Sequence, residues 1–552
     1  MNSNIYKLRG ILLTATVAAI GLLAACEPDM VYEKTRLFRP VLGSPLESEL
    51  NTIIVNMGDI KEATSYTIEV SRDSFNVVDY QFTVDTNYVV IDESLTGEAL
   101  LFNTLYQVRA TAHAASEQYD SRPADLGSVR TQRFPSILNL PKYFDVTDKK
   151  ARVTWTPAGA TVTKVKIFAK EDLRLKTPLK EYEVDAAAAS TGAFIIDGLE
   201  PETAYQMAIY SGATLRGWVD YNTLTAGIYP GDAGVIDLTQ TEDPDALGVA
   251  VDGAPDGAII LLKRGALYNF PSNNLNKSIT IKGAYDLTPN RAIMFTTGNW
   301  NVDKGAKIDH IVFDDLEMRG EDIGGDYVFN INNSGDATDI QRLEFNNCEI
   351  HHFRGIMRLR SDVFVRNYHL LNSVIHDIGG YATFTCDTDG EGKAAVDNAI
   401  YRNSTFYRIN TFMITRQNMQ SFMIDACTVN EAAATGQRVF RFRGKDGFND
   451  VLNGLTIQNT IWGHGWDEAE SGNYGVILKE GLPNTAVTVV NTWGTADFSA
   501  NEGTEIGGFP SLKYSKKAAD LWAAPYDGNF QIKDPGFAGK FDAGDPRWRA
   551  TL

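Results

Sequence analysis

Apolar and polar residues alternate along the chain after residue 230, and the alternation recurs at a regular pitch. Each occurrence reads apolar, spacer, apolar, spacer, and then a turn position before a small residue. The turn positions lie 32, 25, 31, 23 and 33 residues apart. A short strand followed by a turn, repeated at this pitch, predicts a solenoid of β-strands. The six segments are Ile311–Leu316, Leu343–Cys348, Tyr368–Ser373, Ala399–Ser404, Phe422–Cys427 and Leu455–Thr460.

A second strand is predicted in each repeat, between the segments just described. Its apolar residues also alternate with polar ones, so one face should point inward and the other toward water. Asparagine or aspartate fills most turn positions, which suits a left-handed backbone and side-chain bonding between repeats. These second strands are predicted at Phe329–Ile331, Met357–Arg360, Phe384–Asp387, Phe412–Thr415, Phe440–Arg443 and Val476–Lys479.

Two sets of short alternating strands precede the repeats, at residues 40–133 and 134–228. Strands of this length, separated by turn residues over about 90–100 residues, predict a β-sandwich. The second set carries Gly198–Tyr205 together with Trp155, which resembles the fibronectin type III signature. That resemblance places Trp155 and Tyr205 in the core. The first set matches less well, with Met57 at the tryptophan position. We expect both sandwiches to act as a stalk.

The N-terminus has the pattern of a secretory signal. Lys7 and Arg9 precede an apolar run at residues 11–23, which is too short for a stable membrane span. The Leu23-Ala-Ala-Cys26 sequence resembles a bacterial lipobox, which implies that residues 1–26 are a lipoprotein signal and that Cys26 is the lipid attachment site. Residues 27–39 are predicted to be a tether. We therefore expect a protein anchored to the outer membrane by lipid alone, at the cell surface.

Two segments extend the family resemblance to the repeats. Asp256–Gly265 followed by Ser278–Gly283 resembles the entry coil of the right-handed parallel β-helix of pectin-lyase-like proteins. Gly544–Trp548 resembles the close of a β-helix family found in surface lipoproteins of bacterial glycan-utilisation systems. The resemblance implies an all-β chain: two fibronectin type III-like sandwiches, then a right-handed parallel β-helix at residues 229–552. It also implies outer-membrane glycan-uptake proteins as partners.

Composition narrows the classes of function. The chain has 552 residues and a net charge of −19, which disfavours a nucleic-acid ligand because phosphates need cationic partners.

Cys348 and Cys427 share one register three coils apart, a separation of about 14 Å at the strand spacing. A disulfide needs Cα atoms within about 7 Å. We therefore predict buried free thiols, with Cys386 also unpaired.

The outward positions of the second strands form a column that is unexpectedly rich in arginine for an acidic chain. Guanidinium groups match carboxylates bidentately, so the column predicts binding of an acidic, uronate-rich, pectin-like polysaccharide. The alternative is a solvated face in which arginine pairs with neighbouring aspartate. Glycan binding is assigned to Arg358, Arg360, Thr385, Arg441 and Arg443, with Trp466 stacking on a sugar ring. The full column is Asn330, Asn332, Arg358, Arg360, Thr385, Asp387, Thr415, Gln417, Arg441, Arg443 and Lys479.

Three acids beside a glycine turn suggest a second chemistry. Asp387, Asp389 and Glu391 could gather the carboxylate oxygens that Ca²⁺ prefers, which makes Ca²⁺ the candidate cofactor. Together with Arg358 or Arg360 as base, the arrangement resembles pectate lyases and implies a calcium-dependent β-elimination of the same glycan. The Arg-x-Pro-x-x-Arg run of those enzymes is absent from the sequence. A third alternative is an adhesin or structural spacer.

Overall fold

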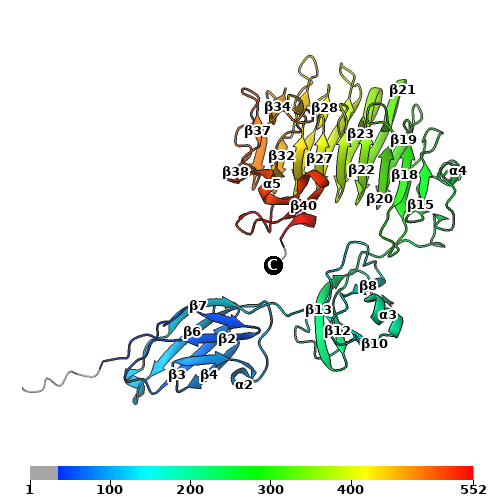
Figure 1. Cartoon of the computed structure of the whole chain (residues 1–552). Helices are drawn as coiled ribbons and strands as arrows, with labels where there is room; N and C mark the ends of the chain where they lie inside the picture. The colour runs from blue at the N-terminus through cyan, green and yellow to red at the C-terminus, as the bar shows by residue number, and fades with distance from the viewer. Residues whose placement is uncertain (1–34, 551–552) are drawn as a thin grey trace, which may run out of the picture. The chain divides into compact units, whose positions relative to one another are not determined.

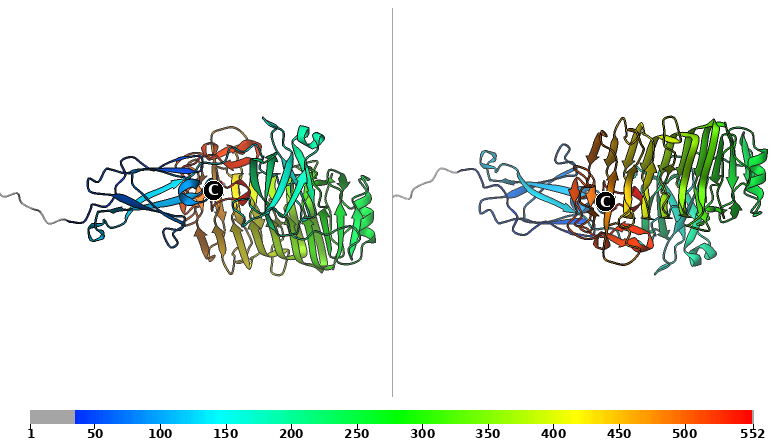
Figure 2. Two further views of the ribbon diagram at one scale, coloured as in Figure 1. Left: turned by 90° about the horizontal axis from the view of Figure 1, so that it is seen from below. Right: turned by 90° about the horizontal axis from the view of Figure 1, so that it is seen from above.

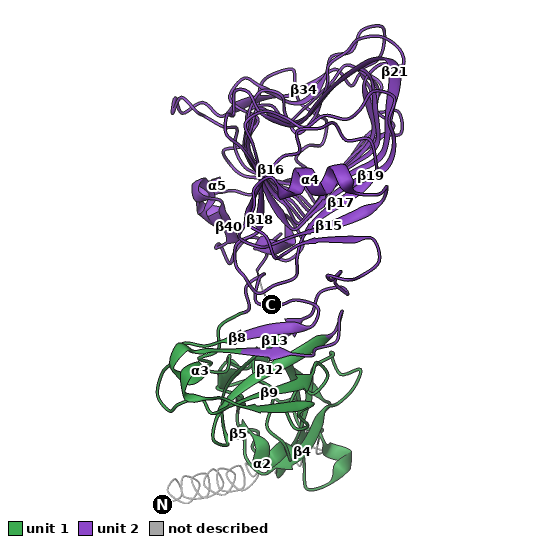
Figure 3. Cartoon of the chain, turned by 90° about the vertical axis from the view of Figure 1, so that its right-hand side faces the viewer, with its two compact units in different colours: residues 1–140, 154–194, 204–220 green, residues 141–153, 195–203, 221–552 purple. Residues whose placement is uncertain are grey.

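The computed structural model describes residues 35–550, and in this part of the chain nearly all regular structure is β-strand. Cys26, the predicted signal and most of the predicted tether lie outside the described residues. Within them, no helix is long and apolar enough to cross a membrane. The chain divides into two compact units, one drawn from residues up to 220 and the other containing all of residues 221–550, as Figure 3 colours them. The boundary passes through the second sandwich, and each unit is described by itself.

The first sandwich consists of two antiparallel sheets, β1-β2-β5 and β4-β3-β6-β7. Alternate residues of its strands face a shared apolar core in which Tyr106 and Val108 are fully buried. Met57, at the expected tryptophan position, is also buried. The strands are β1 (Glu47–Glu49), β2 (Thr52–Asn56), β3 (Ser65–Ser71), β4 (Tyr80–Val84), β5 (Tyr88–Ile91), β6 (Leu105–His113) and β7 (Ala124–Arg130), with the short helices α2 (Glu93–Thr96) and η1 (Glu117–Tyr119).

The second sandwich has a four-stranded sheet, β10-β9-β12-β13, and a two-stranded sheet, β11-β8. Trp155, Leu199 and Tyr205 are buried, as the resemblance to fibronectin type III domains predicts. The elements are β8 (Lys150–Thr154), β9 (Lys164–Ala169), β10 (Lys180–Glu183), α3 (Ala186–Thr191), β11 (Ala193–Asp197), β12 (Ala204–Ser211) and β13 (Thr214–Asn222).

The rest of the chain is a parallel β-helix, so the predicted all-β fold class is confirmed. Its strands pair in parallel with the equivalent strands of the previous and next coils, where a coil is one full turn of the solenoid. Three long faces result. We call them the first, second and third sheets, in the order that the chain follows within one coil from β21 onward. Figures 1 and 2 show the strands stacked side by side along one axis.

The first sheet carries the strands predicted between the repeated segments. It contains the first parts of β21 (Tyr327–Asn346) and β23 (Gly355–Leu371), because each of these long strands bends from the first sheet into the second. The remaining strands of the first sheet are β25 (Thr385–Cys386), β28 (Met413–Thr415), β31 (Arg438–Phe442), β34 (Gly475–Glu480) and β37 (Ser499–Ala500).

The second and third sheets meet at the asparagine turn. The second contains β14 (Val235–Leu238), β15 (Ala258–Leu262), β17 (Ile279–Gly283), β19 (Lys307–Asp314), the later parts of β21 and β23, β26 (Ala395–Arg402), β29 (Ser421–Asp425), β32 (Leu455–Gln458) and β35 (Val487–Val490). The third contains β16 (Leu267–Asn269), β18 (Ala292–Thr296), β20 (Leu316–Gly320), β22 (Glu349–Phe353), β24 (Val374–Ile378), β27 (Thr405–Ile409), β30 (Thr428–Ala432), β33 (Ile461–Trp462), β36 (Trp493–Gly494) and β38 (Leu512–Lys513).

The turn positions form the predicted ladder. Asn347, Asn372, Asn403 and Asn459 all have φ between 50° and 53°, in the left-handed region that asparagine tolerates. The Asn403 side-chain amide donates to Asn372 Oδ1 at 3.1 Å in the preceding coil. Ala426 takes the same conformation in the coil that lacks asparagine, with a φ of 52°. The side-chain bonds therefore support the turn, while the backbone geometry is set by the stacked coils.

Both ends of the solenoid interior are filled by apolar side chains. Near β15 and β16, the helix α4 (Ala246–Gly253) lies across the end of the stack and buries Leu247 and Val251 (Figure 3).

Cys348, Cys386 and Cys427 are buried and free, as predicted. Burial raises the pKa of the Cys348 and Cys386 thiols to about 12, so these thiols are inert near neutral pH.

The C-terminal segment folds back over the outside of the third sheet. It contains α5 (Ala518–Leu521), β39 (Trp522–Ala524), η2 (Pro525–Asp527), β40 (Asn529–Ile532) and η3 (Pro546–Trp548). The Asp545 carboxylate accepts a hydrogen bond from Thr405 Oγ1 at 2.7 Å, and Arg547 Nη2 donates to the Asn372 carbonyl at 2.7 Å. The Gly544–Trp548 motif therefore fastens this segment to the coils it covers.

Candidate functional site

Strand pairing brings arginines from separate coils together on the first sheet. Arg358 and Arg360 flank the inward residue Leu359 on β23, and Arg441 and Arg443 flank the inward residue Phe442 at the end of β31. Parallel pairing puts one row through Arg358, Thr385, Ile414 and Arg441. The next outward position, two residues further along each strand, gives a second row through Arg360, Asp387, Arg416 and Arg443.

Asp387 is the centre of this surface. Its Oδ2 accepts hydrogen bonds from Arg358 Nη2 at 2.5 Å and from Arg358 Nε at 3.2 Å. Its Oδ1 lies 3.3 Å from Arg416 Nε and 3.3 Å from Arg443 Nη2. One carboxylate thus joins guanidinium groups from three coils, and only 14% of its side chain is exposed.

Positive charge exceeds negative charge in this group. We call Arg358, Arg360, Arg416, Arg441 and Arg443 the arginine cluster. The acids paired with them are Asp387, Asp389, which lies 2.7 Å from Arg416 Nη1, and Glu480, which lies 3.2 Å from Arg441 Nε. Five arginines against three acids leave a formal charge of 5 − 3 = +2 on a chain whose net charge is −19.

Two of the arginines lack sufficient acceptors. Arg360 donates to Asn330 Oδ1 at 3.0 Å, but its Nε is buried without a partner. Arg443 Nε is likewise buried without a partner. Burial, and then the like charge of Arg358, lowers the pKa of Arg360; burial, and then Arg416 and Arg441, lowers the pKa of Arg443. The site therefore disfavours its own charge, and a bound anion would relieve that cost.

Aromatic side chains hold one edge of the cluster in place. The guanidinium carbons of Arg358 and Arg354 each lie 4.5 Å from the centroid of the Tyr381 ring. Tyr381 meets Tyr327 edge to face, with the ring centroids 5.7 Å apart. Stacking of this kind fixes the plane of a guanidinium and lowers the entropy lost when it binds a carboxylate.

The predicted calcium ligands do not converge. Asp387 and Asp389 direct oxygens toward arginines, whereas Glu391 is exposed. Among residues 35–550, no group of three or more histidine, cysteine, aspartate or glutamate side chains has the geometry to hold a metal ion. Asp387 and Asp389 act here as counterions of the arginines, and a role in binding Ca²⁺ stays a prediction.

The register of one coil differs from the prediction. Met413, rather than Phe412, pairs with Phe440, so Thr415 faces inward and is fully buried. A shift of one residue exchanges the two faces of a strand. Arg416 consequently occupies the outward row, and the sequence analysis missed it. A hydrophobic run from Phe412 to Ile414 gives no period-2 signal that could have fixed the phase.

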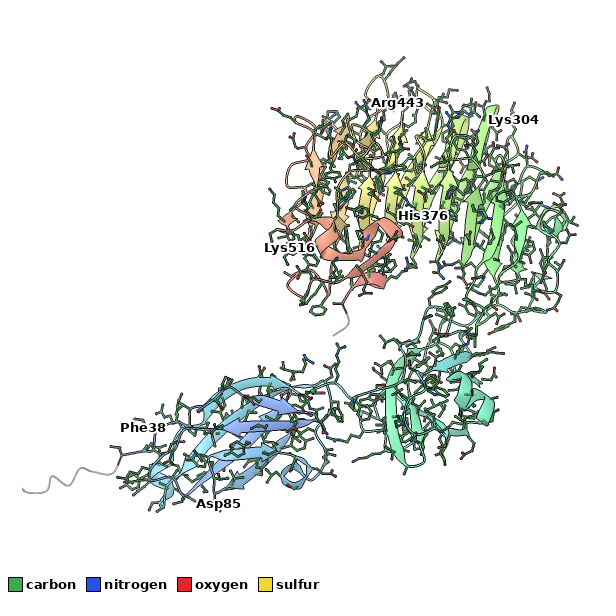
Figure 4. All side chains as sticks on the ribbon, viewed as in Figure 1. Phe38, Asp85, Lys304, His376, Arg443 and Lys516 are labelled. Carbon is green, nitrogen blue, oxygen red and sulfur yellow. The ribbon has the colours of Figure 1, made fainter. Side chains whose placement is uncertain are left out.

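Two further predicted glycan-binding residues lie outside the cluster. Thr385 is only 1% exposed, and its hydroxyl donates to the Tyr381 carbonyl at 2.7 Å, so it is not on the surface where it was expected. Trp466 lines a separate cavity, whose lining contains no lysine or arginine. Arg443 marks the first sheet in Figure 4, apart from His376 of the third sheet.

Comparison with known families covers the β-helix in two pieces. A domain of unknown function (DUF4957) matches residues 266–411, and a second domain of unknown function (DUF5123) matches residues 422–548. Arg358, Arg360 and Asp387 fall within the first match and Arg441 and Arg443 within the second. The arginine cluster is therefore assembled from both matched regions.

Similar solved structures are fibronectin arrays. The chicken CNTN1 FN1–FN3 domains are 13% identical, with a TM-score of 0.15, and the match covers 35% of this chain and 70% of that one. The central fibronectin-III array of RIM-binding protein is 15% identical, with a TM-score of 0.13, and the match covers 36% of this chain and 65% of that one. Such scores carry no argument, so the description of the sandwiches rests on their strand pairing. No curated protein matches the chain.

Proposed function

We propose that this chain is a surface lipoprotein whose β-helix, of the pectin-lyase-like type, binds an acidic, uronate-rich polysaccharide at the arginine cluster. The observation that carries the proposal is the excess of half-buried guanidinium groups around Asp387, two of which have lowered pKa values. Sugar carboxylates would supply the missing acceptors, and Arg forks bind them bidentately.

The layout of the cluster favours a polymer over a small anion. Arginines lie on three of four successive coils, which are spaced by about 4.8 Å, so several carboxylates of one extended chain could bind at once. Linked contacts raise the overall affinity well above that of one sugar. The attraction is electrostatic and should weaken as salt increases.

The remaining parts of the proposal concern location. Cys26 would carry the lipid, the two sandwiches would form a stalk, and the protein would act at the outer surface of the outer membrane beside glycan-uptake proteins. The lipobox-like Leu23–Cys26 sequence supports this placement. Labelling of the intact protein with radioactive palmitate, lost in a Cys26→Ala variant, would test it.

Affinity electrophoresis through gels containing polygalacturonate tests binding at the cluster. The Arg358→Ala/Arg360→Ala double variant should lose at least about tenfold in affinity, since two charge-assisted contacts are each worth on the order of 1 kcal/mol or more. The matched control is Arg342→Ala/Arg402→Ala, which removes two arginines from the second sheet. Equal retention of both double variants would contradict the proposal.

A calcium-dependent lyase acting on the same glycan is the second candidate. The pKa of Arg360 is lowered by burial and by Arg358, which favours Arg360 as a base. Arg358 is less suited: burial is the largest single influence and acts to lower its pKa, but the hydrogen bond and the charge of Asp387, together with Tyr381 and Tyr327, raise the pKa overall. Ultraviolet absorbance of unsaturated products, measured with Ca²⁺ and with a chelator, tests this function. Retention of the protein by the glycan without ultraviolet absorbance would support binding alone. If no acidic glycan gave either retention or absorbance, the adhesin or structural spacer would be favoured.

A further inference from the structure

A second surface of the β-helix has the opposite chemistry to the arginine cluster. Strand β30, the loop that follows β33 and η2 of the C-terminal segment line an open cavity of about 510 Å³. Four acids line it: Glu431, Asp467, Glu468 and Glu470. We call it the acidic cavity. Its volume lies within the range of small-molecule sites, about 300–1,000 Å³.

Aromatic rings form the rest of the wall. Trp466, Tyr474 and Tyr526 line the cavity, and the ring of His464 lies 4.4 Å from that of Tyr474. His464 Nδ1 lies 2.8 Å from the Gly465 carbonyl and donates to it, since a carbonyl oxygen can only accept. His464 Nε2 lies 3.2 Å from the Tyr526 hydroxyl, so this ring connects the loop after β33 to the C-terminal segment.

Glu431 is the unusual member of this group. Only 9% of the residue is exposed, and its Oε2 is buried without a hydrogen-bond partner. Its backbone φ is 51°, in the left-handed region, and its N–H donates to the His464 carbonyl at 2.8 Å. The fold thus holds a carboxyl group against the cavity without giving it a counterion.

The cation that acts on Glu431 already has a counterion. Arg408 is the positive group that acts on Glu431, but its Nε lies 2.8 Å from Asp377 Oδ1, and Asp377 acts on Glu431 with the opposite sign. Burial dominates and raises the pKa of Glu431 to about 7. The carboxyl is therefore partly protonated near neutral pH, and a bound positive charge would favour its ionised form.

We propose that the acidic cavity binds a ligand carrying a positively charged amine, with an amino sugar as the class that suits its size and its aromatic walls. The ammonium group would face Glu431 and the other acids, because a cation gains from both carboxylates and aromatic faces. The sugar ring would stack on Trp466, and its hydroxyls would reach the Tyr526 oxygen. An acidic sugar would be repelled, which separates this site from the arginine cluster.

Calorimetric titration of the purified full chain with glucosamine at pH 7 tests the proposal. Glucose and N-acetylglucosamine are the matched probes, since they keep the ring and remove the charge. We expect glucosamine to bind at least about tenfold more tightly than either, as one added ion pair in a half-buried site predicts. Equal affinities for the three sugars, or no binding of glucosamine, would overturn the proposal.

The pH dependence of binding gives an independent reading. Tetramethylammonium keeps its charge at every pH, so any change in its affinity with pH reflects ionisation of groups in the protein. Its affinity should rise about tenfold between pH 6 and pH 8 as Glu431 ionises. A flat profile would overturn the role of Glu431, because the predicted rise in affinity depends on ionisation of its carboxyl.

Two variants locate the site. Glu431→Gln keeps the shape of the side chain and should weaken glucosamine binding at least about tenfold and abolish the pH slope. Trp466→Ala should weaken glucosamine binding while the affinity for tetramethylammonium still rises with pH. Glu502→Gln, an exposed residue outside the cavity, is the matched control. The Arg358→Ala/Arg360→Ala variant should bind glucosamine normally, so failure of the glycan proposal would leave this one standing. Unchanged binding by Glu431→Gln would overturn it.

Discussion

The arginine cluster and the acidic cavity occupy one solenoid but are constructed in different ways. In the cluster, regular strand pairing aligns arginines from three coils and places Asp387 of a fourth coil among them. In the cavity, β30 supplies Glu431, the loop after β33 supplies Trp466 and the other acids, and the C-terminal segment adds Tyr526. The repeat therefore supplies aligned charges with internal counterions, whereas departures from the repeat create a concave site with a carboxyl group that has none.

Both surfaces hold ionisable groups whose charged form is disfavoured. Burial and crowding lower the pKa of Arg360 and Arg443, and burial raises the pKa of Glu431 to about 7. A bound anion should favour the charged form of the arginines in the cluster, and a bound cation should favour the charged form of Glu431 in the cavity. Three substitutions test this contrast.

The largest effect is expected for Glu431→Gln. Since the pKa of Glu431 is raised from 4.5 to about 7, the folded protein holds an extra proton between those values, and its stability falls as pH rises through that window. The Glu431→Gln variant has no carboxyl to ionise at this position, so it does not lose this stability as the pH rises. Its free energy of unfolding, relative to the parent, should therefore increase by on the order of 3 kcal/mol from pH 4 to pH 8.

Urea denaturation at the two pH values measures this change. Comparing the difference at pH 8 with the difference at pH 4 cancels the cost of burying the amide, which is the same at both. Glu502→Gln should show no such pH-dependent change. If the Glu431→Gln difference were the same at pH 4 and pH 8, the carboxyl would not be the buried, uncompensated group described above.

A smaller effect is expected for Asp387→Asn. This change leaves the guanidinium groups of Arg358, Arg416 and Arg443 without their shared counterion, and it should destabilise the protein by about 2 kcal/mol. The cluster charge would rise from +2 to +3, so retention by polygalacturonate should increase. Asp389→Asn is the control for stability, since it raises the cluster charge by the same amount while Asp389 pairs with Arg416 and is more exposed. Weaker retention by Asp387→Asn would show that Asp387 orders the arginines more than it neutralises them.

The smallest effect is expected for Glu480→Gln at the edge of the cluster. Glu480 pairs with Arg438 and Arg441, but 37% of its side chain is exposed, so water screens the pair. Stability should change by less than about 0.5 kcal/mol, and retention by polygalacturonate should rise about twofold. Thermal denaturation and affinity electrophoresis measure the two quantities. A large loss of stability would mean that Glu480 fixes the end of β34 rather than tuning charge.

Much of the architecture could be predicted because it depends on local pattern. The spacing of Asn347, Asn372 and Asn403 after apolar strands predicts the turn between the second and third sheets, and the turns have the expected left-handed backbone. The burial of Cys348 and Cys427 follows from their shared register. The side chains of Arg358 and Arg360 face outward because the alternation on β23 is clear.

The details of both sites depend on information that no local pattern holds. The phase of β28 is fixed by pairing with its neighbours, which brings Arg416 beside Asp387 and buries Thr415. Trp466 lines the acidic cavity together with Glu431 and Tyr526, which are distant from it in sequence.

The sequence by itself determined the strand repeat, the turn ladder and the alternation that sends arginines outward, because each depends on residues a few positions apart. Only the tertiary structure decided which charges meet and which lose water. Asp387 gathers arginines from coils about 30 residues apart in sequence, and Glu431 owes its raised pKa to burial beneath distant segments. Electrostatic energies depend on distance in space and on solvent exposure, and both are set when the coils stack.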